Sequence, residues 1–234
     1  MNTLLLLAAS DHCRAWQHNQ ERYRPVQRLT VAWLVLAAAW TQNLLAHDWP
    51  AVGGDRANTR YSQLTQINRQ TVGNLKLAWT YHTGELDRAR QKTIECTPLV
   101  VDGTMFITTG HLRVVAVNAA TGAERWQFDP FAESDAAPLL ASGGVNRGAA
   151  YWSDGQPNGE RRILFGSASG HLYSLDAATG QLDPAFGNQG EKDLREDLEH
   201  DIRHLAYGPT SAPAIWRDTV ILGFSCGERP GPAA

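Results

Sequence analysis

The chain contains three cysteines, Cys13, Cys96 and Cys226, whose spacing can be compared with the motifs of metal and cofactor sites. They form no CxxC or CxxxxC pattern, which excludes a zinc ribbon, an iron–sulfur site and a covalent haem attachment. Cys13 lies in an N-terminal leader, so the folded part of the chain holds only Cys96 and Cys226. These two either form a disulfide or remain two buried thiols, because the sequence does not give their separation.

Charge and composition exclude a further class of function. The 234 residues carry a net charge of −3, and 43% of them are hydrophobic and 19% charged, which is typical of a folded protein. Basic residues are scattered along the chain, so we expect no nucleic acid as a partner. Eight tryptophans are many for a chain of this length and indicate a repeated packing role.

The first 46 residues have the pattern of a targeting segment. A basic flank (Arg22–Arg28) precedes twelve apolar residues (Leu29–Trp40), and the small residue Ala46 suits a cleavage site. Twelve residues are few for a bilayer span. Residues 1–21, with a second apolar run, precede the flank, so either the true start lies further in or the leader is an uncleaved anchor. We expect export to the periplasm, with the leader as the only membrane attachment and residues 47–234 as the folded domain.

The folded domain contains a sequence motif that occurs twice. TTGHLRVVAVNAATGAERWQF (Thr108–Phe128) and GSASGHLYSLDAATGQLDPAFG (Gly166–Gly187) both join an apolar run to Ala-Ala-Thr-Gly. Short strands with a glycine and aromatic motif in each unit predict an all-β propeller, in which Thr-Gly turns the chain between the third and fourth strands. Trp126 then covers the edge between blades, whereas the second copy has only Phe186. A β-sandwich with two similar hairpins is the alternative.

One segment breaks the β pattern. EKDLREDLEHDIRHL (Glu191–Leu205) is the only fair candidate for an amphipathic helix, and we interpret it as an insertion.

Several ordered motifs resemble the start of quinoprotein dehydrogenases, which depend on pyrroloquinoline quinone (PQQ). They are residues 48–85 (DWPAVGGDRANTRYSQLTQINRQTVGNLKLAWTYHTGE), IECTPLVVDGTMFITT, VNRGAAYW, RRILFGSASGHLYSLDAATG, FGNQGEKDLRED and TSAPAIWRDTVILGFSCGERPGP. The resemblance covers nearly all of residues 48–234 and is strongest to the glucose and quinate dehydrogenase branch. It implies an eight-bladed propeller, PQQ and Ca²⁺ (or Mg²⁺), hydride transfer from an aldose or alcohol to the quinone, and ubiquinone or a cytochrome as electron acceptor.

The resemblance also implies roles for five residues. Glu95 matches a carboxylate that contacts the cofactor, and Arg147 an arginine that binds a PQQ carboxylate, a planar anion that suits a bidentate guanidinium. Thr210 and Ser225 match hydroxyl contacts to the cofactor. Glu228 falls where the alcohol dehydrogenase branch has a metal ligand, and a carboxylate suits a hard cation. Each role has a structural alternative. Glu95 would be a solvated glutamate at the start of a strand, and Arg147 would form an ion pair at the rim of a blade. Thr210 and Ser225 would make hydrogen bonds at strand ends.

The chain departs from the family pattern in two ways. Ala141 and Ser142 stand about where the alcohol dehydrogenase branch has two adjacent cysteines over PQQ, so that disulfide cannot form, and no histidine replaces it. The 188 residues from 47 to 234 also provide only about three blades. The catalytic aspartate base is therefore expected beyond residue 234, and neither Asp193 nor Asp201 substitutes for it.

Two functions follow from this pattern. The first is the N-terminal portion of a PQQ-dependent dehydrogenase, which we expect to be inactive alone. The second is a non-catalytic repeat module of the outer-membrane assembly scaffold type. A scaffold has no need of Glu95, Arg147, Thr210, Ser225 and Glu228 together, and this favours the enzyme.

Overall fold

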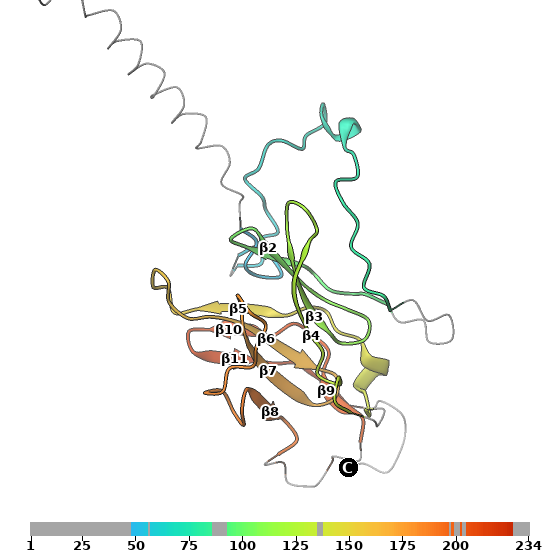
Figure 1. Cartoon of the computed structure of the whole chain (residues 1–234), viewed down its shortest axis with the longest axis vertical. Helices are drawn as coiled ribbons and strands as arrows, with labels where there is room; N and C mark the ends of the chain where they lie inside the picture. The colour runs from blue at the N-terminus through green and yellow to red at the C-terminus, as the bar shows by residue number, and fades with distance from the viewer. Residues whose placement is uncertain are drawn as a thin grey trace, which may run out of the picture. The chain divides into compact units, whose positions relative to one another are not determined.

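The computed structural model describes a β-rich unit within residues 47–234 (Figure 1). The described residues are 48–55, 57–85, 93–134, 138–196, 198, 202 and 205–226. The leader predicted over residues 1–46 lies outside them. The short 3₁₀ turns η2 (Val72–Asn74) and η3 (Ala141–Gly144) are the helical elements of this part of the chain. None of its helices has the length and apolarity that a membrane span requires.

The first blade is a four-stranded antiparallel meander. Its strands follow the order of the sequence and are β1 (Leu99–Val101), β2 (Thr104–Thr108), β3 (Val114–Asn118) and β4 (Glu124–Phe128). Asp102 and Gly103 join β1 to β2 with φ of 48° and 68°. Positive φ at both residues is the geometry of a two-residue hairpin turn, so the Asp-Gly hairpin prediction is confirmed.

The second blade repeats the meander with an interrupted outer strand. Its strands are β5 (Ala150–Ser153), β6 (Arg161–Ser167), β7 (His171–Asp176) and β8 (Glu191–Asp193). The helix predicted from Glu191 is wrong at its start, because β8 pairs with β7 and places Asp193 opposite His171. Between Gly180 and β8 the chain forms no regular strand, although Leu182 bridges to Leu175 and both Asp183 and Gly190 form backbone hydrogen bonds with Ser174 of β7. This irregularity accompanies the loss of the tryptophan from the second copy.

A third unit provides one interrupted hairpin. It consists of β9 (Tyr207–Pro209), β10 (Ala214–Trp216), β11 (Thr219–Ile221) and β12 (Phe224–Cys226). β9 pairs with β12 and β10 with β11, so residues 210–213 on one side face only residues 222–223 on the other. The hairpin contacts β5 and β6 of the second blade. Separate consecutive meanders are propeller blades rather than the two facing sheets of a sandwich, and the propeller prediction is confirmed.

Successive blades contact each other through a tryptophan side chain that packs against a turn containing glycine. Trp126 of β4 donates its Nε1–H to the carbonyl of Ala177 at 3.1 Å, and its indole lies where a Cβ on Gly180 would be. Trp79 makes the same contact with the first blade, donating to the carbonyl of Ala119 at 3.1 Å and covering Gly122. The inter-blade role predicted for Trp126 is therefore confirmed, and Trp79 is a second copy that the sequence analysis missed.

The core is built between the blades, because each sheet is covered on both faces. The central strands β3 and β7 are buried over four successive residues, without the alternation of a half-exposed strand. Phe128 of the first blade packs on Tyr173 of the second, with ring centroids 5.3 Å apart. Phe106 packs on Trp126 at 5.9 Å.

A methyl group at Gly180 tests the inter-blade contact. We expect Gly180→Ala to lower the free energy of unfolding by roughly 2–4 kcal/mol, because the Cβ overlaps with the Trp126 indole and φ is +72°. Gly103→Ala is the matched control, with φ of +68° and nothing within 4 Å of its Cβ. It should cost only about 1 kcal/mol. Urea unfolding of both variants provides the measurement, and equal losses would exclude the tryptophan contact as the cause.

Candidate functional site

Glu95 and Arg147 come together at the beginnings of two innermost strands. Glu95 precedes β1 by four residues and Arg147 precedes β5 by three. Arg147 Nη2 lies 3.4 Å from Glu95 Oε2, and the two side chains remain 54% and 38% exposed. An ion pair this exposed contributes only about 0–1 kcal/mol. The guanidinium can therefore exchange this partner for a ligand at little cost.

Backbone hydrogen bonds join three blades at the same place. Thr97 N–H donates to the carbonyl of Arg147 at 3.3 Å, and Arg147 N–H donates to the carbonyl of Thr210 at 3.0 Å. Gly148 allows this approach, because its φ is +127° and a Cβ there would lie 3.2 Å from the carbonyl oxygen of Thr97. The structure thus gathers three of the predicted residues, Glu95, Arg147 and the buried Thr210, at the inner ends of the blades.

Ser225 has a different partner. Its hydroxyl lies 2.7 Å from the hydroxyl of Ser142, 83 residues earlier in the chain. Ser142 belongs to η3, where it and the two following glycines all have positive φ. The bond ties β12 of the third unit to the loop that leads to Arg147. Glu228, the remaining predicted site residue, lies outside the described residues.

Cys96 is a free thiol beside this site. The backbone N–H of Thr108 donates to its Sγ at 3.1 Å. Burial raises the pKa of the thiol, and the hydrogen bonds of Thr108 oppose that shift only in part. Of the two cysteines left open by the sequence, Cys96 is therefore unpaired.

The half-exposed guanidinium of Arg147 suits a carboxylate group of a ligand. Thr210, which follows β9, and Ser225 on the paired strand β12 add hydroxyl groups, and the Ser225 hydroxyl is bonded to Ser142. Across the described ranges no three His, Cys, Asp or Glu side chains gather as metal ligands. Among the described residues that the sequence assigned to the site, Glu95 is the carboxylate that suits a hard cation.

Two further polar groups at this end of the blades were missed from the sequence. In the first blade the Glu85 carboxylate, 7% exposed, accepts from the Thr109 hydroxyl at 2.6 Å and faces Arg113, which pairs with Asp129 at 2.8 Å. Arg113 precedes β3, and the equivalent position in the second blade is His171 at the start of β7. The Gly-His-Leu tripeptides of the two copies are not structurally equivalent, because His111 lies in a loop and His171 in a strand. The sequence similarity therefore did not reveal that Arg113 corresponds to His171.

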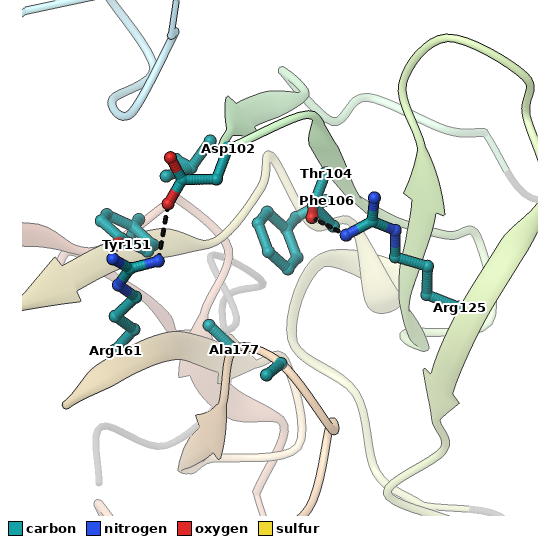
Figure 2. A pocket seen from close by; sticks show the side chains of 9 residues that line it. Asp102, Thr104, Phe106, Arg125, Tyr151, Arg161 and Ala177 are labelled. Atoms are coloured by element: carbon teal, nitrogen blue, oxygen red, sulfur yellow. Dashed lines mark hydrogen bonds and ion pairs between the residues drawn. The ribbon is translucent and has the colours of Figure 1, made fainter. Parts of the chain in front are cut away.

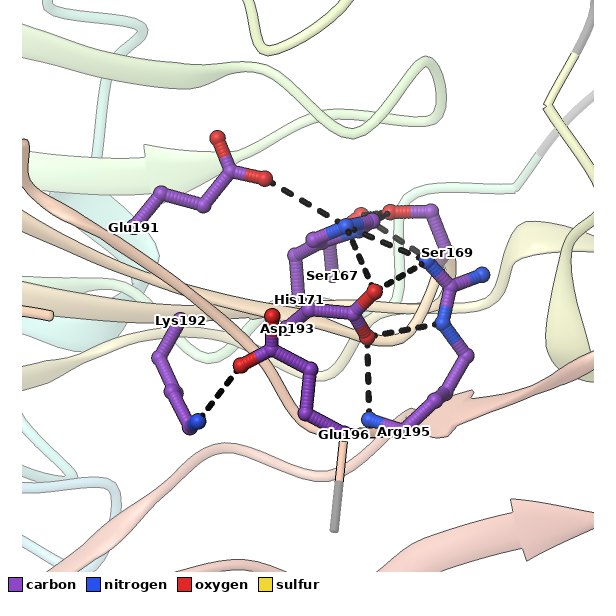
Figure 3. A network of polar contacts seen from close by, with 8 residues as sticks. All are labelled: Ser167, Ser169, His171, Glu191, Lys192, Asp193, Arg195 and Glu196. Atoms are coloured by element: carbon purple, nitrogen blue, oxygen red, sulfur yellow. Dashed lines mark hydrogen bonds and ion pairs between the residues drawn. The ribbon is translucent and has the colours of Figure 1, made fainter. Parts of the chain in front are cut away.

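The group around His171 is internally satisfied (Figure 3). Its Nδ1 lies 3.1 Å from the Ser169 hydroxyl, and its Nε2 lies 3.2 Å from Arg195 Nη2. Arg195 donates to both carboxylate oxygens of Asp193, and this pairing lowers the pKa of Asp193. These side chains bind one another and stabilise the outer part of the second blade.

A pocket lies at the opposite end of the same two blades (Figure 2). It is lined by the turn that joins β1 to β2, by the first residues of β4 and β6, and by the residues that follow β7. The register places these positions far from Thr108 and Ser167, which lie at the Arg147 end of their strands. The pocket is therefore separate from the candidate site.

Comparisons with known proteins agree with the fold. The profile of the PQQ family described as "Glucose/ethanol/alcohol dehydrogenase, beta-propeller domain" matches residues 49–232. The quinoprotein glucose dehydrogenase of Escherichia coli is 33% identical over 186 residues, which are 76% of this chain and 23% of that protein. The dehydrogenase subunit of the quinone-dependent alcohol dehydrogenase of Gluconacetobacter polyoxogenes is 44% identical over 176 residues, 75% of this chain and 21% of that protein.

Solved structures show the same similarity. The quinohemoprotein alcohol dehydrogenase of Comamonas testosteroni matches with a TM-score of 0.58 and 32% identity over 77% of this chain and 23% of that one. A europium-containing methanol dehydrogenase matches with a TM-score of 0.58 and 30% identity, over 78% of this chain and 28% of that one. The chain thus spans about a fifth to a quarter of the length of the relatives it matches.

The raised pKa of Cys96 predicts slow alkylation in the folded chain. Because burial disfavours the thiolate, the reaction with iodoacetamide should accelerate only at a pH above the ordinary thiol range. Peptide mass spectrometry follows Cys96 separately from the other cysteines, and the urea-unfolded chain is its own control. Near pH 8 we expect native Cys96 to react about tenfold or more slowly than unfolded Cys96. Identical pH profiles in the two states would contradict the burial of this thiol.

Proposed function

This chain belongs to the PQQ-dependent glucose, ethanol and alcohol dehydrogenase propellers, and from that premise we propose that it forms the N-terminal blades of a periplasmic dehydrogenase. The whole enzyme would oxidise an aldose or an alcohol. Its electrons would pass to ubiquinone or a cytochrome. Export would be directed by the leader over residues 1–46, which also offers the only membrane attachment that we propose.

The observation that supports this proposal is the convergence of Glu95, Arg147 and Thr210. Three blades, which contribute residues 95–97, 147 and 210, meet there through two backbone hydrogen bonds. The blades of a propeller surround a central channel, where a ligand contacts several blades at once. A ligand at that place would meet a guanidinium, a carboxylate and a hydroxyl from three separate parts of the chain.

Each of these side chains has a defined task at such a site. Arg147 would bind a carboxylate of PQQ through its guanidinium, releasing its exposed pair with Glu95. The hydroxyl groups of Thr210 and Ser225 would donate to cofactor oxygens. Glu95 would accept a hydrogen bond at the rim. When bound, the quinone supplies the two-electron acceptor for the substrate.

We also propose a metal ligand and a source for the catalytic base. Glu228 would bind Ca²⁺ or Mg²⁺, and the catalytic aspartate would come from the remaining blades. Because the chain covers 16–24% of its curated relatives, we propose that hydride transfer requires the rest of the propeller and that this chain alone is inactive.

The quenching of tryptophan fluorescence by added PQQ tests the role of Arg147. The 234-residue chain should bind PQQ weakly, and Arg147→Gln should raise the dissociation constant about tenfold or more, because a charge-assisted pair is lost. Arg69→Gln removes an exposed arginine of the segment before η2 and is the matched control. Equal affinities of the chain and the Arg147 variant would remove Arg147 from the cofactor site.

The proposed inactivity has its own measurement. With PQQ, Ca²⁺ and either glucose or ethanol, the chain should reduce no dye. Substrate-dependent dye reduction would overturn this part of the proposal.

A further inference from the structure

The pocket between the first two blades has an apolar floor and a charged rim. Its volume is about 190 Å³. Val101, Phe106 and Ala177 on its lining are buried, whereas Arg125 and Arg161 on its rim are exposed. Figure 2 shows the Asp102–Arg161 pair on one side of the Phe106 ring and the Thr104–Arg125 pair on the other. A ligand that enters would meet apolar surface below and guanidinium groups at the mouth.

The rim carries an uncompensated positive charge. Arg161 Nη1 pairs with Asp102 Oδ2 at 2.6 Å. Arg125 instead donates to the Thr104 hydroxyl at 2.6 Å, and within the described part of the chain it faces no carboxylate in an ion pair. A threonine hydroxyl that accepts one hydrogen bond still has its own hydrogen to donate. Arg125 and Thr104 together therefore form an unused donor group beside an apolar floor.

The equivalent contact that Trp79 makes with the first blade shows that packing does not require these arginines. The residue before Trp126 is Arg125, and the residue before the equivalent Trp79 is Ala78. The carbonyl that accepts from Ala177 N–H belongs to Arg161, and the one that accepts from Ala119 N–H belongs to Gly103. Both contacts keep the tryptophan, its hydrogen bond and the covered glycine. Only the contact between the first and second blades adds two guanidinium groups to this frame.

We propose that this pocket binds a small carboxylate with an apolar body. The carboxylate would take the guanidinium of Arg125 and the hydroxyl of Thr104, and the apolar body would lie on Phe106 and Ala177. The volume is below the roughly 300–1,000 Å³ of pockets for drug-sized ligands, which limits the body to about one ring or a short branched chain. The site lies at the opposite end of the blades from Arg147, and it does not depend on the proposed dehydrogenase function.

Calorimetric titration of the 234-residue chain with benzoate tests the proposal. We expect a dissociation constant on the order of 1 mM. Arg125→Ala, which installs the residue of the equivalent position in the preceding contact, should weaken binding about tenfold or more. Asp102→Asn should strengthen it about two- to threefold, because a negative charge leaves the rim. Asparagine also tolerates the φ of 48° at that position.

Three controls decide between this site and unspecific binding. Arg69→Ala, which removes an exposed arginine far along the chain from the pocket, should leave the benzoate affinity unchanged. Benzyl alcohol, which has the ring without the charge, should bind about tenfold or more weakly than benzoate. Absence of benzoate binding, an unchanged affinity in Arg125→Ala, or equal binding of benzyl alcohol would each overturn the proposal. Circular dichroism verifies that every variant is folded.

Discussion

The contact between a tryptophan and the next blade's glycine turn determines how the blades lie against each other. A single four-stranded sheet has two apolar faces and cannot bury either by itself. Trp126 covers Gly180 and donates to the carbonyl of Ala177, and Trp79 does the same at Gly122 and Ala119. Because the two contacts use equivalent atoms, Trp79 packs on the first blade in the way that Trp126 packs on the second. Across the Trp126 contact, Arg147 of the second blade meets Glu95 and Thr97 of the first.

The Glu95–Arg147 pair and the group around His171 differ in how many of their polar atoms have a partner. Asp193 accepts hydrogen bonds from two nitrogens of Arg195, and His171 has partners on both ring nitrogens. Such a network stabilises the fold and leaves little for a ligand. Glu95 and Arg147 share one exposed contact of 3.4 Å. The difference in partnering, rather than in residue type, separates the ligand-facing pair from the structural network.

The sequence predicted the features that local chemistry determines. Asp102–Gly103 and the two Thr-Gly turns require positive φ, so their letters alone indicated the hairpins. Trp79 was missed because its segment forms no regular strand beside it, and only the hydrogen bond to Ala119 reveals the equivalence. The strand β8 was mistaken for a helix because its charges suit helical spacing, whereas the pairing of Asp193 with His171 depends on a partner far along the chain. Ser142 and Ser225 are likewise 83 residues apart.

The repeated tryptophan contact also explains how equivalent blade junctions can differ in their surface residues. The tryptophan, the alanine carbonyl and the glycine are the parts of the blade contact that packing requires, and they are the same in both copies. Ala78 and Gly103 in one contact and Arg125 and Arg161 in the next are free to differ, because they lie at the rim of the contact rather than under the indole. The cost of changing a rim residue is small, since an exposed side chain loses little on substitution. New ligand contacts can therefore arise at one blade junction without disturbing the alignment that brings Arg147 to the inner ends of the blades.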